Sequence, residues 1–344
     1  MPEAPLVITA PTAPTKTRRK APPALVIFGI GWLMLMLIVA LLADILAPYA
    51  YTALDLRNRL SPPILLGGTW LHPLGTDELG RDVLSRLIYS IRTSLLIAFG
   101  ATIIGAAVGT SLGFLAAHFR GFIEQAVLAL VDFSASLPFL ILALAVLAFF
   151  GNSLLLLVCL LGLHAWERYA RIARGLALAA GTQGYAAAVR GLGASPWRIY
   201  GRHVLPNIAS TLIVSMTLAF PEVILLESGL SFLGLGVQPP ETSLGSMVGY
   251  GREYLTRAPW ILLAPASTIV LTTLSVSLIG DWLRDGLDDH THVLETRITP
   301  TLMTHLLWRV HQDSRQFFNG CKKWEDRHAL PRSTLPSAVR ALVD

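Results

Sequence analysis

The chain has 344 residues, of which 53% are hydrophobic and only 14% are charged, and its net charge is +5. Soluble globular domains carry about 25% charged residues, so this composition excludes an ordinary soluble protein and indicates an integral membrane protein. The basic residues flank apolar runs, as the positive-inside bias of membrane insertion predicts, and nucleic-acid binding is therefore not expected. Cys159 and Cys321 lie too far apart in the sequence to indicate a disulfide framework or a metal quartet.

Six apolar segments are each long enough to cross a membrane as a helix of about 20 residues. In chain order they are 25–43, 93–117, 125–149, 154–173, 206–226 and 258–280. The turn residues Gly151-Asn152-Ser153 separate the third segment from the fourth. Glycines at near-helical spacing in the second segment predict close contact with a neighbouring helix: Gly100, Gly105, Gly109 and Gly113. The sequence therefore predicts an all-α integral membrane protein with six transmembrane helices.

The charges favour an orientation with both termini in the cytoplasm. The first apolar segment follows a basic cluster and is longer than the core of a signal peptide, so we expect a retained span. The segment from Glu167 to Asn207 contains one acidic residue, Glu167, and six arginines: Arg168, Arg171, Arg174, Arg190, Arg198 and Arg202. In the outer segments, aspartates and glutamates offset the arginines. This asymmetry places the loop after the fourth span inside the cell.

The expected domain organisation has three parts. Residues 1–24 form a disordered cytoplasmic lead, and 25–284 form the six-helix domain, with a transport core at about 90–281. Residues 285–344 have mixed charge and little periodicity, which predicts a poorly ordered cytoplasmic extension. A regulatory domain or a tail created by a shifted reading frame are the alternatives for this last part.

The long inner loop contains the polar segment GLGASPWRIYGRHVLPN, residues 191–207. An apolar stripe at i, i+4 and i+7 predicts a short amphipathic helix before it, and Gly193 is a typical helix end. Ser195 and Pro196 form a typical start for a second short helix, which would reach about His203. The predicted helix, glycine elbow and helix either anchor the loop at the membrane surface or fit into a groove of another protein.

The spacing of Ala188, Gly193, Leu205 and Pro206 resembles the "EAA, three residues, Gly, nine residues, Ile-x-Leu-Pro" loop of permease subunits of binding-protein-dependent ABC importers. In that family the loop docks into a cleft of the cytoplasmic ATPase and transmits its closure to the spans. The resemblance implies ATPase-coupling roles for Tyr185, Ala187, Ala188, Arg190, Gly193, Ala194 and Pro206. Ala187 stands where the pattern has glutamate, so the loop lacks this acidic partner for a salt bridge to the ATPase.

Two further segments resemble the dipeptide, oligopeptide and nickel subfamily of these permeases: HPLGTDELGRDVLSRLIYSIRTSL (72–95) and LSFLGLGVQPP (230–240). The likeness then covers about residues 25–288. In the first segment we expect Thr76 to cap an interfacial helix, with Arg81, Asp82 and Arg86 facing water. The resemblance implies that a periplasmic binding protein contacts this outer surface; a solvated loop without a partner is the alternative.

The sequence has no phosphate-binding loop of the form G-x-x-x-x-G-K-[ST], so ATP hydrolysis is not expected in this chain. The resemblance implies a transport subunit rather than an enzyme, placed in a bacterial inner membrane. Its partners would be a second permease subunit, two cytoplasmic ATPase subunits, a substrate-binding protein and membrane lipid. Alternating access driven by the two coupling loops is the implied mechanism.

Three acidic residues fall in or near the predicted spans: Asp132, Glu222 and Glu227. An ionised side chain at the bilayer centre costs about 2.5 to 3.5 kcal/mol, so we expect them to face protein or water. Structural pairing is the favoured interpretation, ahead of a place in the translocation pathway. A proton-coupled secondary transporter that uses these acids is the alternative function. No catalytic motif, cofactor or metal site is expected, and the sequence leaves open whether the substrate is a dipeptide, an oligopeptide, glutathione or a nickel chelate.

Overall fold

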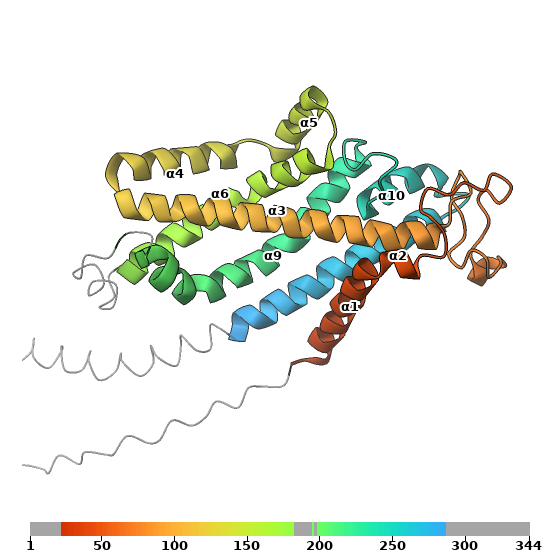
Figure 1. Ribbon diagram of the computed structural model, residues 1–344, viewed down its shortest axis with the longest axis horizontal. Helices are drawn as coiled ribbons and strands as arrows, with labels where there is room; N and C mark the ends of the chain where they lie inside the picture. Colours follow the sequence, from red (N-terminus) through yellow and green to blue (C-terminus); the bar gives the residue numbers. More distant parts are fainter. Residues whose placement is uncertain (1–21, 182–194, 196–197, 287–344) are drawn as a thin grey trace, which may run out of the picture. The chain divides into compact units, whose positions relative to one another are not determined.

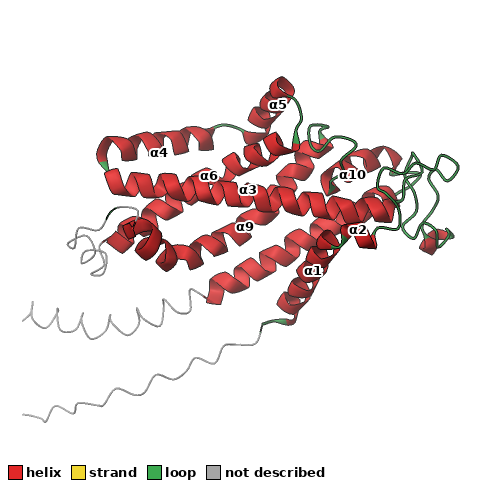
Figure 2. Ribbon diagram, in the orientation of Figure 1, coloured by secondary structure: helices red, strands yellow, loops and turns green. Residues whose placement is uncertain are grey.

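The structure is a computed structural model that describes residues 22–181, 195 and 198–286. Over these residues it contains helices and loops, with one isolated bridge between Thr76 and Asp82 and no strand (Figure 2). The elements are α1 (Ala24–Leu41), α2 (Ala43–Leu46), η1 (Ile64–Leu66), α3 (Val83–Phe119), α4 (Gly121–Ser136), α5 (Phe139–Phe150), α6 (Leu154–Gly181), η2 (Ile199–Val204), α9 (Leu205–Phe232), α10 (Leu244–Gly251), η3 (Arg252–Tyr254) and a last helix, Trp260–Gly286.

Among the described helices, four are long and apolar enough to span a membrane: α1, α3, α9 and Trp260–Gly286. The pair α4 and α5 makes a fifth span if the two helices, which meet at a bend of 88°, cross the membrane together. The predicted span 154–173 corresponds to α6, which is long enough but carries Glu167 and several arginines in its second half. The structure therefore supports an all-helical membrane protein with four or five clear spans.

Helices α3 and α6 run side by side in close contact (Figure 1), and glycines make that contact possible. A Cβ atom on Gly109 would lie 2.7 Å from the Cβ of Tyr169, and one on Gly113 would lie 2.6 Å from the carbonyl oxygen of Ala170. A Cβ atom on Gly105 would lie 2.8 Å from the carbonyl oxygen of Gly162. The close contact predicted from the glycine spacing is confirmed.

The start of α3 differs from the prediction. Asp82, and not Thr76, is the N-cap, and its carboxylate accepts a 2.8 Å hydrogen bond from the backbone N–H of Ser85. The expected interfacial helix is instead the beginning of α3 itself, which continues for 37 residues. Asp82 and Arg86 are 4% and 5% exposed, so the prediction that they face water is wrong. Both side chains have polar partners in the loop before α3, which makes their burial possible.

Two prolines within apolar segments affect their helices differently. The predicted third span is broken at Leu137-Pro138, between α4 and α5, because proline has no N–H for a helical hydrogen bond. Pro221 lies inside α9, which runs as one helix from Leu205 to Phe232. The turn predicted at residues 151–153 separates α5 from α6, as expected.

Candidate functional site

The predicted coupling loop falls mostly outside the described residues. Tyr185, Ala187, Ala188, Arg190, Gly193 and Ala194 all lie there. Pro206 is described: it is exposed and stands in the first turn of α9. The chain that returns from the loop to α9 is the π-helical segment η2.

Segment η2 is packed firmly onto two other helices. Ile199, Tyr200 and Val204 are buried, and they belong to one apolar cluster with Ala117 of α3 and Ala180 of α6. The ring of Tyr200 stacks on Phe114 of α3 with the ring centroids 5.2 Å apart. Because η2 leads directly into α9, a displacement of the loop would reach three long helices through this cluster.

Helix α6 carries a row of basic side chains, each of which faces an acid on another helix. The Nη2 atom of Arg168 lies 2.8 Å from Oε2 of Glu222 on α9, and Nε2 of His164 lies 3.7 Å from the other oxygen of that carboxylate. Further along α6, Arg171 lies 3.9 Å from Asp132 of α4. The predicted pairing of Asp132 and Glu222 with protein groups is therefore observed.

The Arg174–Glu124 pair continues the same row. The Nε atom of Arg174 donates a 2.8 Å hydrogen bond to Oε1 of Glu124 on α4. These two side chains are 29% and 19% exposed, so the pair is more enclosed than that of Arg168 and Glu222, at 47% and 42%. The sequence pattern indicated loop charges here, whereas the structure places Arg168, Arg171 and Arg174 on a continuous helix.

Glu227 has a different environment, because it is 1% exposed and no basic side chain pairs with it among the described residues. Its Oε1 atom accepts hydrogen bonds from the hydroxyls of Ser231 and Ser243, each at 2.7 Å. Ser243 is the N-cap of α10, and the backbone N–H of Leu244 donates to Ser94 of α3 at 3.0 Å. Glu227 therefore belongs to a buried polar junction of α9, α10 and α3.

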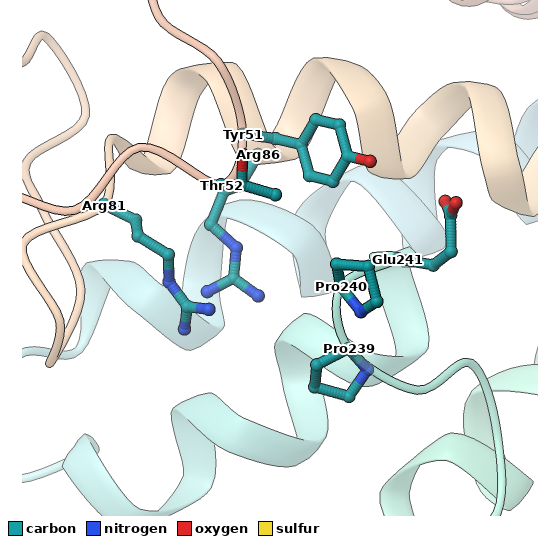
Figure 3. A pocket seen from close by; sticks show the side chains of 7 residues that line it. All are labelled: Tyr51, Thr52, Arg81, Arg86, Pro239, Pro240 and Glu241. Atoms are coloured by element: carbon teal, nitrogen blue, oxygen red, sulfur yellow. The ribbon is translucent and has the colours of Figure 1, made fainter.

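A small cavity of about 190 Å³ lies where the loop before α3 meets the loop after α9. Its walls are Tyr51, Thr52, Arg81, Arg86, Pro239, Pro240 and Glu241 (Figure 3). The two guanidinium groups lie beside each other, and the two prolines form the facing wall. The cavity thus joins the two segments, 72–95 and 230–240, that resembled one subfamily of permeases.

The arginines of this cavity are held by a single buried acid. Asp77 is fully buried, and its Oδ2 atom accepts from Nε of Arg81 at 2.6 Å and from Nη1 of Arg86 at 2.5 Å. Its other oxygen accepts from the backbone N–H groups of Leu79 and Arg81. Asp77 therefore fixes the positions of the two arginine side chains that line the cavity.

Residues 109–293 match the family described as "Binding-protein-dependent transport system inner membrane component". The chain belongs to this family. It is 39% identical over 261 residues to the di/tripeptide transport system permease protein DppC of Pseudomonas aeruginosa, over 76% of this chain and 86% of that protein. It is 36% identical over 258 residues to the oligopeptide transport system permease protein OppC of Mycobacterium tuberculosis, over 74% and 87%. The predicted membership in the peptide branch of ABC permeases is confirmed.

A more distant relative is the glutathione transport system permease protein GsiD of Pectobacterium atrosepticum, 33% identical over 75% of this permease and 84% of that protein. Among solved structures, an inward-facing form of the MetNI methionine ABC transporter aligns with a TM-score of 0.48 and 20% identity, over 58% of this permease and 95% of that chain. The family description and the apolar helices together make this permease a multi-pass protein of the inner membrane.

Sequence reasoning found the acids of the permease but missed most of their partners. Asp77 was not singled out, because nothing in its spacing distinguishes a buried loop acid from a solvated one. The basic row on α6 has a signal that was available: Arg168, Arg171 and Arg174 follow the apolar run of α6 at helical spacing. Within the described residues, no group of three His, Cys, Asp or Glu side chains is arranged to hold a metal ion.

Proposed function

We propose that this permease is one of two membrane subunits of an ATP-driven importer that carries peptides into the cell. A substrate-binding protein would deliver the peptide from outside, and two cytoplasmic ATPase subunits would supply the energy. The observation that carries the proposal is the 39% identity to a di/tripeptide permease over 76% of the chain. The second permease subunit is expected to be a different chain, so that the pathway lies in a heterodimer.

In this proposal α6 is the fourth of six transmembrane helices, and both termini lie in the cytoplasm. A helix of 28 residues is about 42 Å long, which exceeds the thickness of the hydrocarbon core. Residues 154–173 would cross the bilayer, and the remainder of α6, which begins with Arg174, would extend to the cytoplasmic side, as the positive-inside bias favours.

The coupling loop, with Tyr185, Ala187, Ala188, Arg190, Gly193, Ala194 and Pro206, would receive force from the ATPase. The packing of η2 on α3 and α6 supports this role, since a loop tied to packed helices moves them when it moves. ATP binding would draw the two loops together and rock the spans toward the outward-open state. Asp132 and Glu222 would line the pathway, whereas the full burial of Glu227 supports a structural role for that acid.

The test is uptake of a radiolabelled dipeptide by proteoliposomes that contain both permeases and both ATPases, with loaded binding protein outside. We expect uptake that requires ATP and that disappears when Ala188 and Gly193 are both replaced by arginine. Gly175→Ala is a matched control on α6, because a Cβ there meets nothing within 4 Å. Uptake that an uncoupler abolishes and that persists without ATP would instead identify a proton-coupled transporter.

A further inference from the structure

With the outer ends of α6 and α9 at the outer edge of the bilayer, as in the proposed topology, the Arg168–Glu222 pair lies within the hydrocarbon core. Glu222 is ten residues before the end of α9, and His164, which faces the same carboxylate, is ten residues after the start of α6. At 1.5 Å per residue, Glu222 and His164 each lie about 15 Å from the helix end, and Arg168, 14 residues after the start of α6, lies about 21 Å from it. Three ionisable groups therefore meet within a hydrocarbon core of about 30 Å, where charge is costly.

The described helices of this permease leave the pair partly open. The side chains of Arg168 and Glu222 remain 47% and 42% exposed, and that of His164 remains 28% exposed. Ionisable side chains at this depth face a bundle interior or a water-filled cavity rather than lipid. The open side of the pair therefore faces either the translocation pathway or the second permease subunit.

The face of α9 that carries Glu222 also carries two hydroxyl side chains, with Leu218 and Leu226 beside them. Thr211 and Ser215 precede Glu222 by 11 and 7 residues, and at 100° per residue all three fall within about 20° of one line. Ile213 lies on the opposite side of α9 and is 52% exposed, as expected for a lipid-facing residue. Beyond Arg168, the exposed Arg171 and Asp132 extend the polar surface. The pair thus belongs to a hydrophilic wall.

We propose that Arg168 and Glu222 recognise the two ends of a passing peptide, Arg168 binding the α-carboxylate and Glu222 the α-ammonium group. This inference rests on the proposed peptide import. Every unblocked peptide carries these two charges whatever its side chains, so one acid and one base suffice to bind peptides of any sequence.

The chemistry of the pair fits exchange with such a ligand. A guanidinium group has five N–H donors in a fork that matches a carboxylate, and Arg168 approaches Glu222 through Nη2 at 2.8 Å. When no peptide is present, the two side chains neutralise each other. A zwitterion that enters replaces one ion pair by two, and leaves when the original pair forms again, so binding stays weak enough for transport.

The experiment measures binding of radiolabelled dialanine, its C-terminal amide and its N-acetyl derivative to the complete transporter in nanodiscs, without binding protein. Removal of one charge-assisted hydrogen bond to the peptide should weaken binding by about tenfold to a hundredfold. We expect the wild type to prefer the free dipeptide over both derivatives. Arg168→Gln should abolish the preference over the amide, and Glu222→Gln the preference over the acetylated form.

Two further variants separate recognition from structure. Arg168→Lys keeps the charge but lacks the fork, and should retain part of the preference. Arg92→Gln removes an arginine from the exposed pair with Asp44 and should leave binding unchanged. Dissociation of the second permease from the Arg168→Gln protein would assign the pair to the subunit interface and overturn the proposal.

The remaining outcomes are also decisive. Absence of saturable binding to the wild type, equal affinity for the blocked dipeptides, or a preference that survives Arg168→Gln would each overturn the proposal. ATP-driven uptake by the same wild-type preparation is measured in parallel. If uptake occurs and the preference is absent, peptide import stands and only this inference fails; if uptake itself is absent, the proposed function fails.

Discussion

Glu227 on α9 accepts a 2.7 Å hydrogen bond from the hydroxyl of Ser243, the residue that caps α10. The same oxygen accepts from Ser231 one turn further along α9, and the backbone of α10 approaches closely, since a Cβ on Gly245 would lie 2.6 Å from the Cα of Ser228. One carboxyl group therefore fixes the N-terminus of a short helix against a long one.

Replacement of Glu227 by alanine should destabilise the permease strongly. The hydroxyls of Ser231 and Ser243 would lose their acceptor in a buried setting, at about 1 to 3 kcal/mol for each group left without a partner. Glu227→Gln keeps a carbonyl oxygen for the same two donors and should lose less. Thermal unfolding of the purified transporter measures this order, with the exposed Glu253→Ala as control. Equal midpoints for the alanine, glutamine and control proteins would show that the junction contributes nothing.

The close approach of α3 and α6 should not tolerate a methyl group at Gly109. A Cβ there would lie 2.7 Å from the Cβ of Tyr169 and closer still to the carbonyl oxygen of Trp166, and overpacking of this kind costs about 1 to 3 kcal/mol. Alanine otherwise favours a helix over glycine by about 1 kcal/mol, so Gly175→Ala, on the open side of α6, should be neutral or stabilising. The two proteins are compared by thermal unfolding, and a Gly109→Ala protein as stable as Gly175→Ala would refute the close approach.

These positions show which features the sequence could predict. The glycines of α3 and the turn after Phe150 depend on backbone properties of the residues themselves, and both were predicted correctly, whereas the third span was predicted as a single segment and is broken at Pro138. The start of α3 was not, because the capping role of Asp82 depends on a loop that also buries Asp77. In the sequence alone, a buried acid cannot be distinguished from a solvated one, because the difference depends on partners that only the fold brings near.

The partners of the arginines on α6 could not be predicted from the sequence either. In the sequence they were counted as loop charges that favour a cytoplasmic loop. In the structure they lie on α6, where Arg168 pairs with Glu222 of α9 and Arg171 with Asp132 of α4. The sequence showed both signs of charge, but their pairing depends on three helices that are distant in the chain. Contact between such helices is set by packing and not by local spacing.

The pair of Arg174 and Glu124 should behave as a clamp between α6 and α4. Reversing one charge, as in Arg174→Glu, places two acids together in a partly enclosed setting and should destabilise the protein. The double exchange Arg174→Glu with Glu124→Arg restores opposite charges and should recover most of the stability. For groups that touch, the coupling energy of such a double-mutant cycle is about 0.5 to 3 kcal/mol. Additive effects of the two single changes would show that the coupling energy between Arg174 and Glu124 is zero.

Asp77, the buried acid that holds the cavity arginines, should be the most sensitive of the loop residues. Asp77 is fully buried and pairs with both Arg81 and Arg86, so Asp77→Ala leaves two guanidinium groups without their shared acceptor. Removing one partner of a buried pair costs about 3 to 5 kcal/mol. We expect a large fall in the unfolding temperature and faster proteolysis of the segment between α2 and α3.

The matched control for Asp77 is Asp44, which also pairs with an arginine of α3 but at the surface. Its ion pair with Arg92 is 2.9 Å long, and the two side chains are 66% and 41% exposed. Hydrogen bonds from Arg92 and Tyr89 lower the pKa of Asp44 below its usual value of 3.8, so the pair persists at neutral pH and weakens only when the pH falls through that lowered pKa. Asp44→Ala should nevertheless leave stability at pH 7 unchanged, because water takes the place of the carboxylate beside Arg92. If Asp77→Ala were equally harmless, the cavity arginines would have to be held by groups other than this acid.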